Sequence, residues 1–306
     1  MIKSAFTKAS TAEEVTEGLN LSGKTIVITG VNSGLGHESM RVLALRGAHV
    51  IGTARTMQKA KDAAKSVSGK ITPLECELSE FQSVKSCAEA IKKMNIPIDV
   101  LICNAGIMAL PKLEIANGFE QQFNTNHLGH FILVHNLIEA IKQAPQGRLV
   151  MLSSLAHKMA PSDGIMFDNL SGQKWYRDWP FYGQSKLANL LTAVAVAKRF
   201  EGSTATANAI HPGIIRTNLS RSMGGIQGML FNNPLSGWAI GKFLGSKSVP
   251  QGAATQCYVA TASELNGVSG KYFADSNEER PSRNAQDAAL AERLWQFSCD
   301  AVKDYI

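Results

Sequence analysis

Short apolar runs alternate with longer amphipathic segments along the first half of the chain, and this alternation limits the possible folds most. The run Thr25-Ile26-Val27-Ile28-Thr29 is continuous, rich in β-branched residues and followed by glycine, which is typical of a strand buried on both faces. Amphipathic segments of helical period lie between such runs. Continuous apolar strands separated by helical segments predict a parallel sheet with helices on both faces.

The expected strands and helices follow from this periodicity. Strands are predicted at residues 25–29, 49–53, 71–76, 100–103, 148–152, 205–210 and 271–273. Helices are predicted at residues 34–47, 57–67, 80–94, 115–143, 181–200, 251–262 and 285–302, with the long helix broken or capped around Asn117 and Gly118. The expected fold class is α/β, a Rossmann-type doubly wound parallel sheet of about seven strands with helices on both faces.

Composition excludes several classes of protein. The chain carries 31 basic and 25 acidic residues, but the two signs are interleaved. That pattern is typical of a solvated surface, so no nucleic-acid partner is expected. No apolar run approaches the roughly 18 residues that a membrane-spanning helix needs, so no membrane span is expected. The first residues lack the apolar segment of a secretory signal.

The cysteines and histidines predict neither disulfides nor a metal. The 5 cysteines occur without a Cys-x-x-Cys motif. An odd count of this kind favours free thiols in a reducing compartment, and a cytoplasmic location is expected. His127, His130 and His135 lie close together in sequence, but no carboxylate or thiolate at ligand spacing accompanies them.

A glycine-rich turn joins the first predicted strand to the first predicted helix. It reads Thr29-Gly30-Val31-Asn32-Ser33-Gly34-Leu35-Gly36, with the spacing G-x-x-x-G-x-G. Glycines let backbone amides approach a pyrophosphate, and the positive end of the helix favours the same anion. Turn glycines are common, but this turn follows the first strand of a βαβ unit, as a dinucleotide site requires. We therefore expect a nucleotide here.

The end of the second predicted strand indicates which nucleotide. It reads Gly52-Thr53-Ala54-Arg55, without the carboxylate that binds the ribose 2′-hydroxyl in NAD sites. Arg55 offers a bidentate partner for a 2′-phosphate, which favours NADP(H). The alternative is an ordinary surface arginine at the start of a helix.

A chemical centre is expected around Tyr182 and Lys186, which share one helix face at positions i and i+4. A nearby ammonium and the helix N-terminus both lower the pKa of a phenol, so Tyr182 could protonate an alkoxide or deprotonate an alcohol. Ser153 and Ser154 end the fifth predicted strand, where a hydroxyl could hold a substrate carbonyl. The fourth strand ends in Asn104-Ala105-Gly106, a small turn that permits close approach.

Taken together, these motifs resemble the short-chain dehydrogenase/reductase family, and within it the retinol-dehydrogenase-like and WW-domain-oxidoreductase-like branch. They occur in the family's order over residues 22–218. The matching segments are TGVNSGLG at Thr29–Gly36, NAG at Asn104–Gly106, FNTNHLGHF around Asn126, Ser153-Ser154, YGQSK at Tyr182–Lys186, and HPG at His211–Gly213 through Thr217.

The resemblance implies a catalytic tetrad of Asn126, Ser154, Tyr182 and Lys186, in which Ser154 fills the family's serine position. Tyr182 is the implied acid/base, Lys186 binds the nicotinamide ribose, and Asn126 organises a water of the proton relay. The implied cofactor-binding residues are Gly30, Asn32, Ser33, Gly34, Leu35, Gly36, Arg55, Glu77, Leu78, Asn104, Ala105, Gly106, Tyr182, Lys186, Pro212, Gly213, Ile215 and Thr217. Leu78 would flank the adenine, and Pro212 to Thr217 would bracket the nicotinamide.

Two features depart from the family pattern. Glu77 stands where relatives commonly carry aspartate. Ser154 and Tyr182 are 28 positions apart, farther than usual, with an insertion at residues 155–181 that holds Trp175, Tyr176 and Trp179. The insertion is either an aromatic wall over the substrate or a satellite core packed under a long loop.

The stretch at residues 219–250 falls where the family has its variable substrate-binding segment. Its apolar, glycine-interrupted composition predicts an adaptable substrate lid. Peripheral membrane contact is the competing interpretation, but only Arg221 and Lys242 supply the basic character that interfacial helices carry.

We expect one dinucleotide-binding oxidoreductase domain over residues 1–306, with an N-terminal lead at 1–21. The expected activity is NADP(H)-dependent interconversion of a carbonyl and an alcohol on a mainly apolar small molecule, in the reducing direction. The alternatives are an NADP-binding scaffold with little turnover and a nucleotide-sugar epimerase or dehydratase. The oligomeric state is left open.

Overall fold

The computed structural model describes residues 1–215 and 246–306, whose regular elements follow one another in the expected alternation. The strands of the main sheet are β1 (Thr25–Thr29), β2 (His49–Ala54), β3 (Ile71–Glu75), β4 (Val100–Cys103), β7 (Arg148–Leu152), β8 (Thr206–His211), β9 (Tyr272–Ala274) and β10 (Asn277–Glu278). The helices are α1 (Gly34–Leu45), α2 (Met57–Lys65), α3 (Phe81–Lys93), α4 (Gln121–Phe123), α5 (His130–Gln143), α6 (Asp178–Arg199), α9 (Val249–Thr261) and α10 (Ala288–Ala301).

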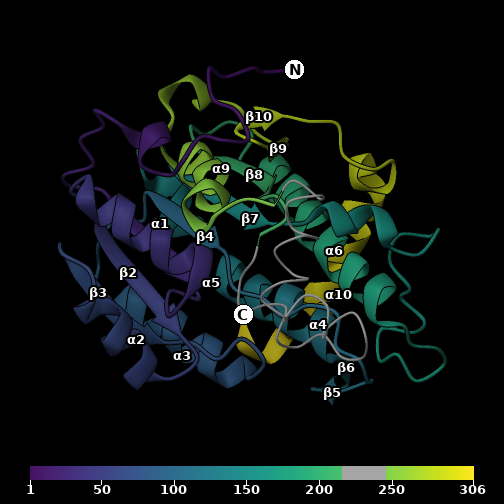
Figure 1. The fold of residues 1–306 in the computed structure, drawn as a ribbon. Helices are drawn as coiled ribbons and strands as arrows, with labels where there is room; N and C mark the ends of the chain where they lie inside the picture. The colour runs from purple at the N-terminus through teal and green to yellow at the C-terminus, as the bar shows by residue number, and fades with distance from the viewer. Residues whose placement is uncertain (216–245) are drawn as a thin grey trace, which may run out of the picture.

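The main sheet has eight strands in the order β10-β9-β8-β7-β4-β1-β2-β3 (Figure 1). Neighbouring strands are parallel except for β9 and β10, which are antiparallel. The predicted α/β fold with a doubly wound parallel sheet is confirmed. The short antiparallel strand β10 adds one strand to the number expected. Its two residues are too few to show a periodicity, so the sequence does not predict it.

Helices cover both faces of the sheet, and alternate residues of each strand serve the two cores. In β1, Val27 belongs to the core under α3, α5, α6 and α10, whereas Ile26 and Ile28 belong to the core under α1 and α9. All five residues of β1 are buried. This burial on both faces is the reason why its sequence is apolar throughout rather than alternating.

The predicted helix 115–143 is wrong over its first residues. β5 (Ile115–Ala116) and β6 (Phe119–Glu120) form an antiparallel hairpin there. Asn117 and Gly118 make its turn, with φ of 52° and 81°, the positive values that an Asn-Gly hairpin turn adopts. The helical part begins with α4, passes through a π-helical turn at Asn124–Gly129 and continues as α5.

The N-terminal residues lie against the edge of the sheet formed by β10. The Glu278 amide donates to the Ile2 carbonyl at 3.0 Å, and the Ser4 amide donates to Asn277 Oδ1 at 2.9 Å. At the opposite edge, β3 contains Pro73, which has no N–H to donate. The expected N-terminal lead is therefore packed onto the fold over its first residues.

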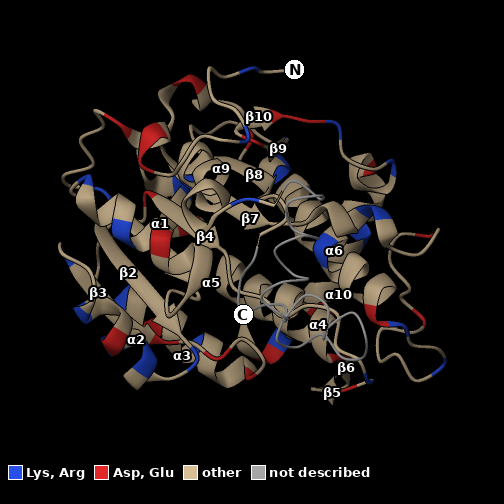
Figure 2. Ribbon diagram, in the orientation of Figure 1, with Lys and Arg blue, Asp and Glu red and all other residues tan. Residues whose placement is uncertain are grey.

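Positions of Lys and Arg and positions of Asp and Glu are dispersed over the elements of the fold (Figure 2). The five cysteines are free thiols. In the described ranges, no helix has the length and apolar character needed to cross a membrane.

Candidate active site

The carboxyl ends of β1, β4, β7 and β8 come together at one edge of the sheet, and the predicted motifs lie there. This edge is where ligands bind in open parallel sheets. The first turns of α6 bring Tyr182 and Lys186 to the same place, next to β7. Residues that are more than 150 positions apart in sequence thus share one site.

The glycine-rich turn folds tightly between β1 and α1. Gly30 and Gly34 have φ of 73° and 60°, and a Cβ on Gly36 would lie 2.3 Å from the Gly30 carbonyl oxygen. The Ser33 side chain, at the N-cap of α1, makes no capping hydrogen bond. The backbone amides in the first turn of α1 therefore do not donate to this side chain. Asn32 and Ser33 are exposed at the tip of the turn. A pyrophosphate is the group that such a turn accommodates.

The turn Asn104–Gly106 packs directly against the glycine-rich turn. Asn104 Nδ2 donates to the Thr29 carbonyl at 2.8 Å, and a Cβ on Gly30 would lie 2.8 Å from Ala105 Cβ. A Cβ on Gly106 would lie 3.0 Å from Asn126 Oδ1 and 3.2 Å from Lys186 Nζ. The absence of side chains at these positions therefore keeps open the space between the glycine loop and the predicted tetrad.

The four predicted tetrad residues lie close together, each held by the fold. Asn126, fully buried, donates from Nδ2 to the Ile107 carbonyl and to Ser185 Oγ, both at 2.9 Å. Lys186 Nζ lies 3.3 Å from the Leu152 carbonyl oxygen and 5.8 Å from the centre of the Tyr182 ring.

The structure distinguishes the two serines at the end of β7. Ser153 is buried, and its hydroxyl donates to the backbone carbonyl of Lys186 at 2.7 Å, so it serves the packing of α6. The Ser154 hydroxyl instead accepts from the Ala156 amide at 3.2 Å, and it lowers the pKa of the Tyr182 phenol against the effect of burial. This placement agrees with the assignment of Ser154, not Ser153, to the tetrad.

Burial sets the protonation states of the two titratable tetrad residues. Burial raises the pKa of Tyr182 to about 12, and the hydrogen bond from Ser154 opposes this shift. Burial lowers the pKa of Lys186 to about 8. Removal of the phenol from water is the largest cause of the raised pKa of Tyr182, and the lowering of that pKa by Lys186 stays a prediction.

The residues predicted to contact the adenosine lie at the ends of β2 and β3. Arg55 is exposed immediately after β2. The Glu77 carboxylate accepts hydrogen bonds from the Ser79 amide and hydroxyl, so it stabilises the turn in which it lies. Leu78 is buried, and a Cβ on Gly129 would lie 2.3 Å from its carbonyl oxygen.

The residues present fit a nicotinamide dinucleotide. The glycine turn provides the phosphate cradle, and Asn104 Oδ1 is a buried acceptor without a partner in the described part of the chain. Comparison with known proteins agrees with this fit. Residues 24–225 match the sequence model of the short chain dehydrogenases. The chain belongs to the short-chain dehydrogenase/reductase family.

Individual members of the short-chain dehydrogenase/reductase family are similar along nearly the whole chain. The chloroplastic short-chain dehydrogenase TIC 32 B of Brassica napus is 42% identical over 98% of this chain and 95% of its own. Retinol dehydrogenase 12 of Mus musculus is 37% identical over 94% and 89%. A crystal structure of an uncharacterized protein from Mycobacterium paratuberculosis is 32% identical, covers 94% of this chain and 97% of its own, and superposes with a TM-score of 0.75.

These relatives support the retinol-dehydrogenase-like branch of the family. The chain is thus an oxidoreductase of a family that uses NAD(P)(H) and acts on small molecules.

The turn after β8 packs against Lys247, a residue of the predicted lid at 219–250 for which the sequence predicts no individual role. Gly213 has φ of 98°, and a Cβ there would lie 2.8 Å from Cδ of Lys247. Lys247 is buried and paired with Asp275, and its amide donates to the Ile214 carbonyl. It lies beneath the predicted nicotinamide turn, yet no local motif marks it.

Ile215 reaches back to the glycine loop. A Cβ on Gly252 would lie 2.3 Å from Ile215 Cδ1 and 2.8 Å from Leu35 Cδ2, so these two apolar side chains meet over α9. Thr217 lies outside the described residues, as does most of the predicted lid at 219–250. The end of that predicted lid, from Val249, is the first turn of α9, where Ser248 and Gln251 form a capping box.

Different residues of the insertion at 155–181 support its two interpretations. Tyr176 packs on the buried Phe181 with ring centres 5.0 Å apart, and its hydroxyl donates to the Leu110 carbonyl at 2.6 Å. These two residues form a satellite core. Trp179 instead contacts the ring of Tyr182, so it forms part of a wall beside the acid/base.

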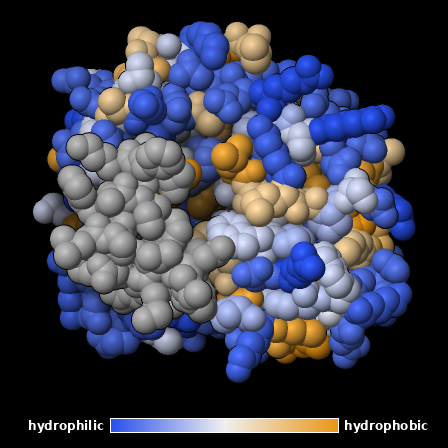
Figure 3. Space-filling view, turned by 45° about the vertical axis from the view of Figure 1, so that its right-hand side comes forward, coloured by the Kyte–Doolittle hydropathy of each residue, from blue (hydrophilic) through white to orange (hydrophobic). Residues whose placement is uncertain are grey.

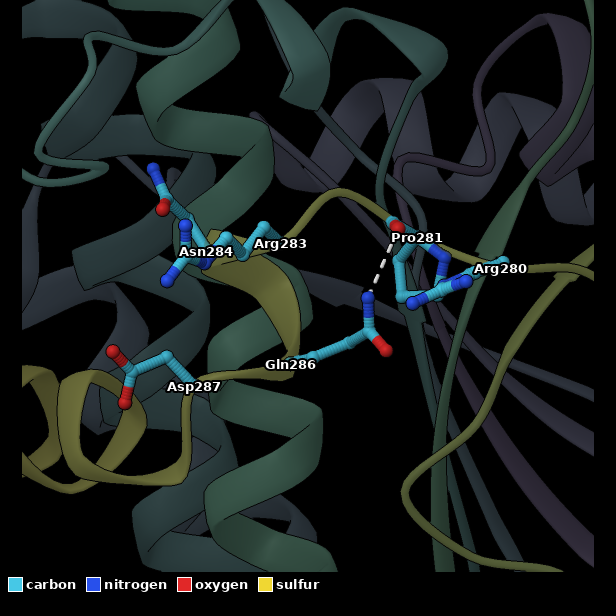
Figure 4. Close-up of a pocket in the computed structure, with 6 residues that line it drawn as sticks. All are labelled: Arg280, Pro281, Arg283, Asn284, Gln286 and Asp287. Carbon is cyan, nitrogen blue, oxygen red and sulfur yellow. Dashed lines mark hydrogen bonds between the residues drawn. The ribbon is translucent and has the colours of Figure 1, made fainter.

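Two further contacts hold the insertion beside the tetrad. Leu155–Met159 form a 3-10 turn that packs on α6 where Gly183 leaves room for it, because a Cβ there would lie 2.5 Å from the Ala156 carbonyl oxygen. The His157 ring accepts from the Ser282 amide at 3.0 Å. Ser282 belongs to the segment that follows β10, which lines a separate polar recess containing Arg280, Arg283 and Gln286 (Figure 4).

Apolar side chains remain exposed near the tetrad. They belong to the segment that follows Ser154 and to the turn after β8, and comprise Leu155, Met159 and Ile214. Figure 3 shows a hollow in the molecular surface with apolar side chains along one side.

Proposed function

We propose that this protein is an NADP(H)-dependent oxidoreductase that interconverts a ketone or aldehyde and an alcohol on a mainly apolar small molecule. The observation that carries the proposal is the buried phenol of Tyr182, whose ring centre lies 5.8 Å from Lys186 Nζ and whose pKa responds to the Ser154 hydroxyl, at the carboxyl ends of the strands. Family membership and the exposed apolar side chains nearby support it.

The protonation state of Tyr182 favours reduction. A phenol with a pKa of about 12 keeps its proton at neutral pH, so it is ready to donate that proton to an oxygen that becomes an alkoxide. The bound dinucleotide supplies the hydride. The Ser154 hydroxyl holds the substrate carbonyl oxygen beside the phenol, Lys186 binds the nicotinamide ribose, and Asn126 organises the water of the proton relay.

Selection of NADP(H) over NAD(H) is assigned to Arg55. It is exposed at the end of β2, and that end carries no carboxylate. Replacing Arg55 with alanine should raise KM for NADPH by about 10-fold or more, since a charge-assisted bidentate contact is lost, and leave KM for NADH nearly unchanged. Equal effects on the two cofactors would contradict the assignment.

Replacement of Tyr182 with phenylalanine tests the reaction itself. Tyr182→Phe should abolish NADPH oxidation with a panel of aldehydes and ketones, while fluorescence titration still shows NADPH binding. Full activity of this variant would overturn the mechanism. Tight NADPH binding by the wild type without turnover of any carbonyl would instead favour the scaffold alternative. The cytoplasmic location stays a prediction.

A further inference from the structure

His130, the first residue of α5, is buried beneath the predicted cofactor site and connects two parts of it. One ring nitrogen, Nε2, lies 2.9 Å from Thr29 Oγ1, and the other, Nδ1, lies 2.9 Å from the Asn126 carbonyl oxygen. Thr29 ends β1 directly before the glycine turn. Asn126 belongs to the predicted tetrad. The histidine is fully buried, so these two contacts decide its state.

The direction of every hydrogen bond in this network follows from its geometry. The Asn104 and Ala105 amides both donate to Thr29 Oγ1, at 2.9 and 3.0 Å. A hydroxyl oxygen has two lone pairs, so both are used, and its single proton must go elsewhere. It goes to Nε2 of His130, which is therefore unprotonated. Nδ1 then carries the ring proton and donates it to the Asn126 carbonyl.

The π-helical turn before α5 makes the Asn126 carbonyl accessible to this side chain. In an α-helix, the His130 amide would donate to that carbonyl, four residues back. Here the His130 amide donates to the His127 carbonyl instead. The Asn126 carbonyl therefore lacks its usual α-helical bond from the His130 amide and accepts from the His130 ring instead.

Burial and a nearby positive charge keep the His130 ring neutral. Burial and the nearby Lys186 ammonium lower its pKa, and the bond to the Asn126 carbonyl opposes them, leaving the pKa at about 4. Burial also lowers the pKa of the neighbouring His127. The uncharged tautomer with its proton on Nδ1 therefore persists at physiological pH.

We propose that His130 is a positioning residue, whose neutral ring ties the Thr29 hydroxyl beneath the glycine turn to the backbone carbonyl of Asn126. This connection fixes the cofactor-binding turns and the proton-relay residue in one relative position. The inference rests on the proposed function for its kinetic consequences but not for its effect on cofactor affinity. His130 itself does not touch substrate or cofactor.

The test compares His130→Phe with His127→Phe. His127 is a matched control, because it is equally buried and lies on the same helical stretch. Its ring nitrogens contact Ser298 and Thr192, which belong to α10 and α6 and not to the cofactor turns. Both variants lose the polar contacts of a fully buried ring, so thermal melts should show destabilisation in both.

Only His130→Phe should alter the site. We expect NADPH affinity and kcat each to fall by about 10-fold or more, the loss typical of a buried polar contact, and the apparent pKa in the pH profile of kcat to shift. His127→Phe should leave the affinity and the pH profile as in the wild type. Identical effects of the two variants at equal folded fraction would overturn the proposal.

A double-mutant cycle provides a second measurement that is independent of turnover. Thr29→Val removes the hydroxyl but keeps the side-chain volume. If His130 acts through Thr29, NADPH affinity in the Thr29→Val, His130→Phe double variant should fall by much less than the product of the single effects. Multiplicative losses would overturn the proposal. Because this cycle measures NADPH binding, its result still tests the role of His130 if Tyr182→Phe contradicts the proposed reaction.

Discussion

The indole of Trp179 meets the ring of Tyr182 edge to face, with ring centres 6.0 Å apart and planes at 80°. Trp179 lies in the first turn of α6, three residues before the acid/base. It is half-buried, in contrast to the exposed Trp175 of the same insertion. The insertion thus supplies one wall beside Tyr182, the predicted acid/base.

Trp179 should therefore contribute to the binding of apolar substrates. We expect Trp179→Ala to raise KM for long-chain or cyclic carbonyls by about 10-fold, since a large apolar contact is lost, and to leave NADPH affinity unchanged. Trp175→Ala is the matched control, because Trp175 packs on Phe181 and not on Tyr182. Steady-state kinetics with both variants decides the point, and an equal rise in KM for both would speak against a wall formed by Trp179.

Gly36 should tolerate no side chain. A Cβ there would lie 2.3 Å from the Gly30 carbonyl oxygen and 2.5 Å from Asn104 Nδ2, and a backbone oxygen cannot move away as a flexible side chain can. We expect Gly36→Ala to abolish measurable NADPH binding. Gly202→Ala, at a turn with open space around it, should cost only about 1 kcal/mol for its positive φ and leave binding intact. Fluorescence titration and chemical denaturation measure the two effects.

The two directions of the proposed reaction should differ in their dependence on pH. With the pKa of Tyr182 at about 12, the phenol stays protonated, so carbonyl reduction should show no loss between pH 6 and 8 from this group. Alcohol oxidation requires the phenolate, whose fraction grows about tenfold per pH unit below the pKa, so its rate should rise steeply with pH. Initial rates over this range test the expectation. A plateau of the oxidation rate already at pH 7 would show that bound cofactor lowers the pKa of Tyr182.

Buried histidines should make the protein sensitive to acid. Burial lowers the pKa of His127 to about 3 and that of His130 to about 4, so both stay neutral in the folded state where the unfolded chain takes up protons. The free energy of unfolding should therefore fall as the pH drops below about 6.5, by about 1.4 kcal/mol per pH unit for each such histidine. Urea denaturation at pH 7, 6 and 5 measures the slope. His127→Leu should make the slope shallower, and an unchanged slope would count against this origin.

Sequence reasoning succeeded where one residue pattern carries the whole signal. Residues 25–29, 100–103 and 148–152 were predicted as strands, and the structure has β1, β4 and β7 at these positions. A strand that is buried on both faces has a continuous apolar sequence, and that sequence alone predicts the strand. The Asn117-Gly118 pair predicts only a break in a helix, because the flanking strands are two residues long and show no period.

Features that depend on packing between distant segments could not be predicted. The spacing of Tyr182 and Lys186 is visible in sequence, but the burial that raises the pKa of the phenol is not. Lys247 lies within the predicted lid at 219–250, but its contact with the turn after β8 depends on the fold, and the sequence predicts no individual role for it. The buried network of His130 likewise needs the π-helical turn, which no local pattern indicates.

The two edges of the main sheet bear on how copies of this protein can associate. A sheet edge with unpaired donors and acceptors is a template onto which another chain can add a strand. The β10 edge already hydrogen-bonds to the N-terminal residues, and the β3 edge lacks a donor at Pro73. Removing the first residues or replacing Pro73 would therefore uncover backbone groups that favour intermolecular β-pairing, and with it aggregation during folding or storage.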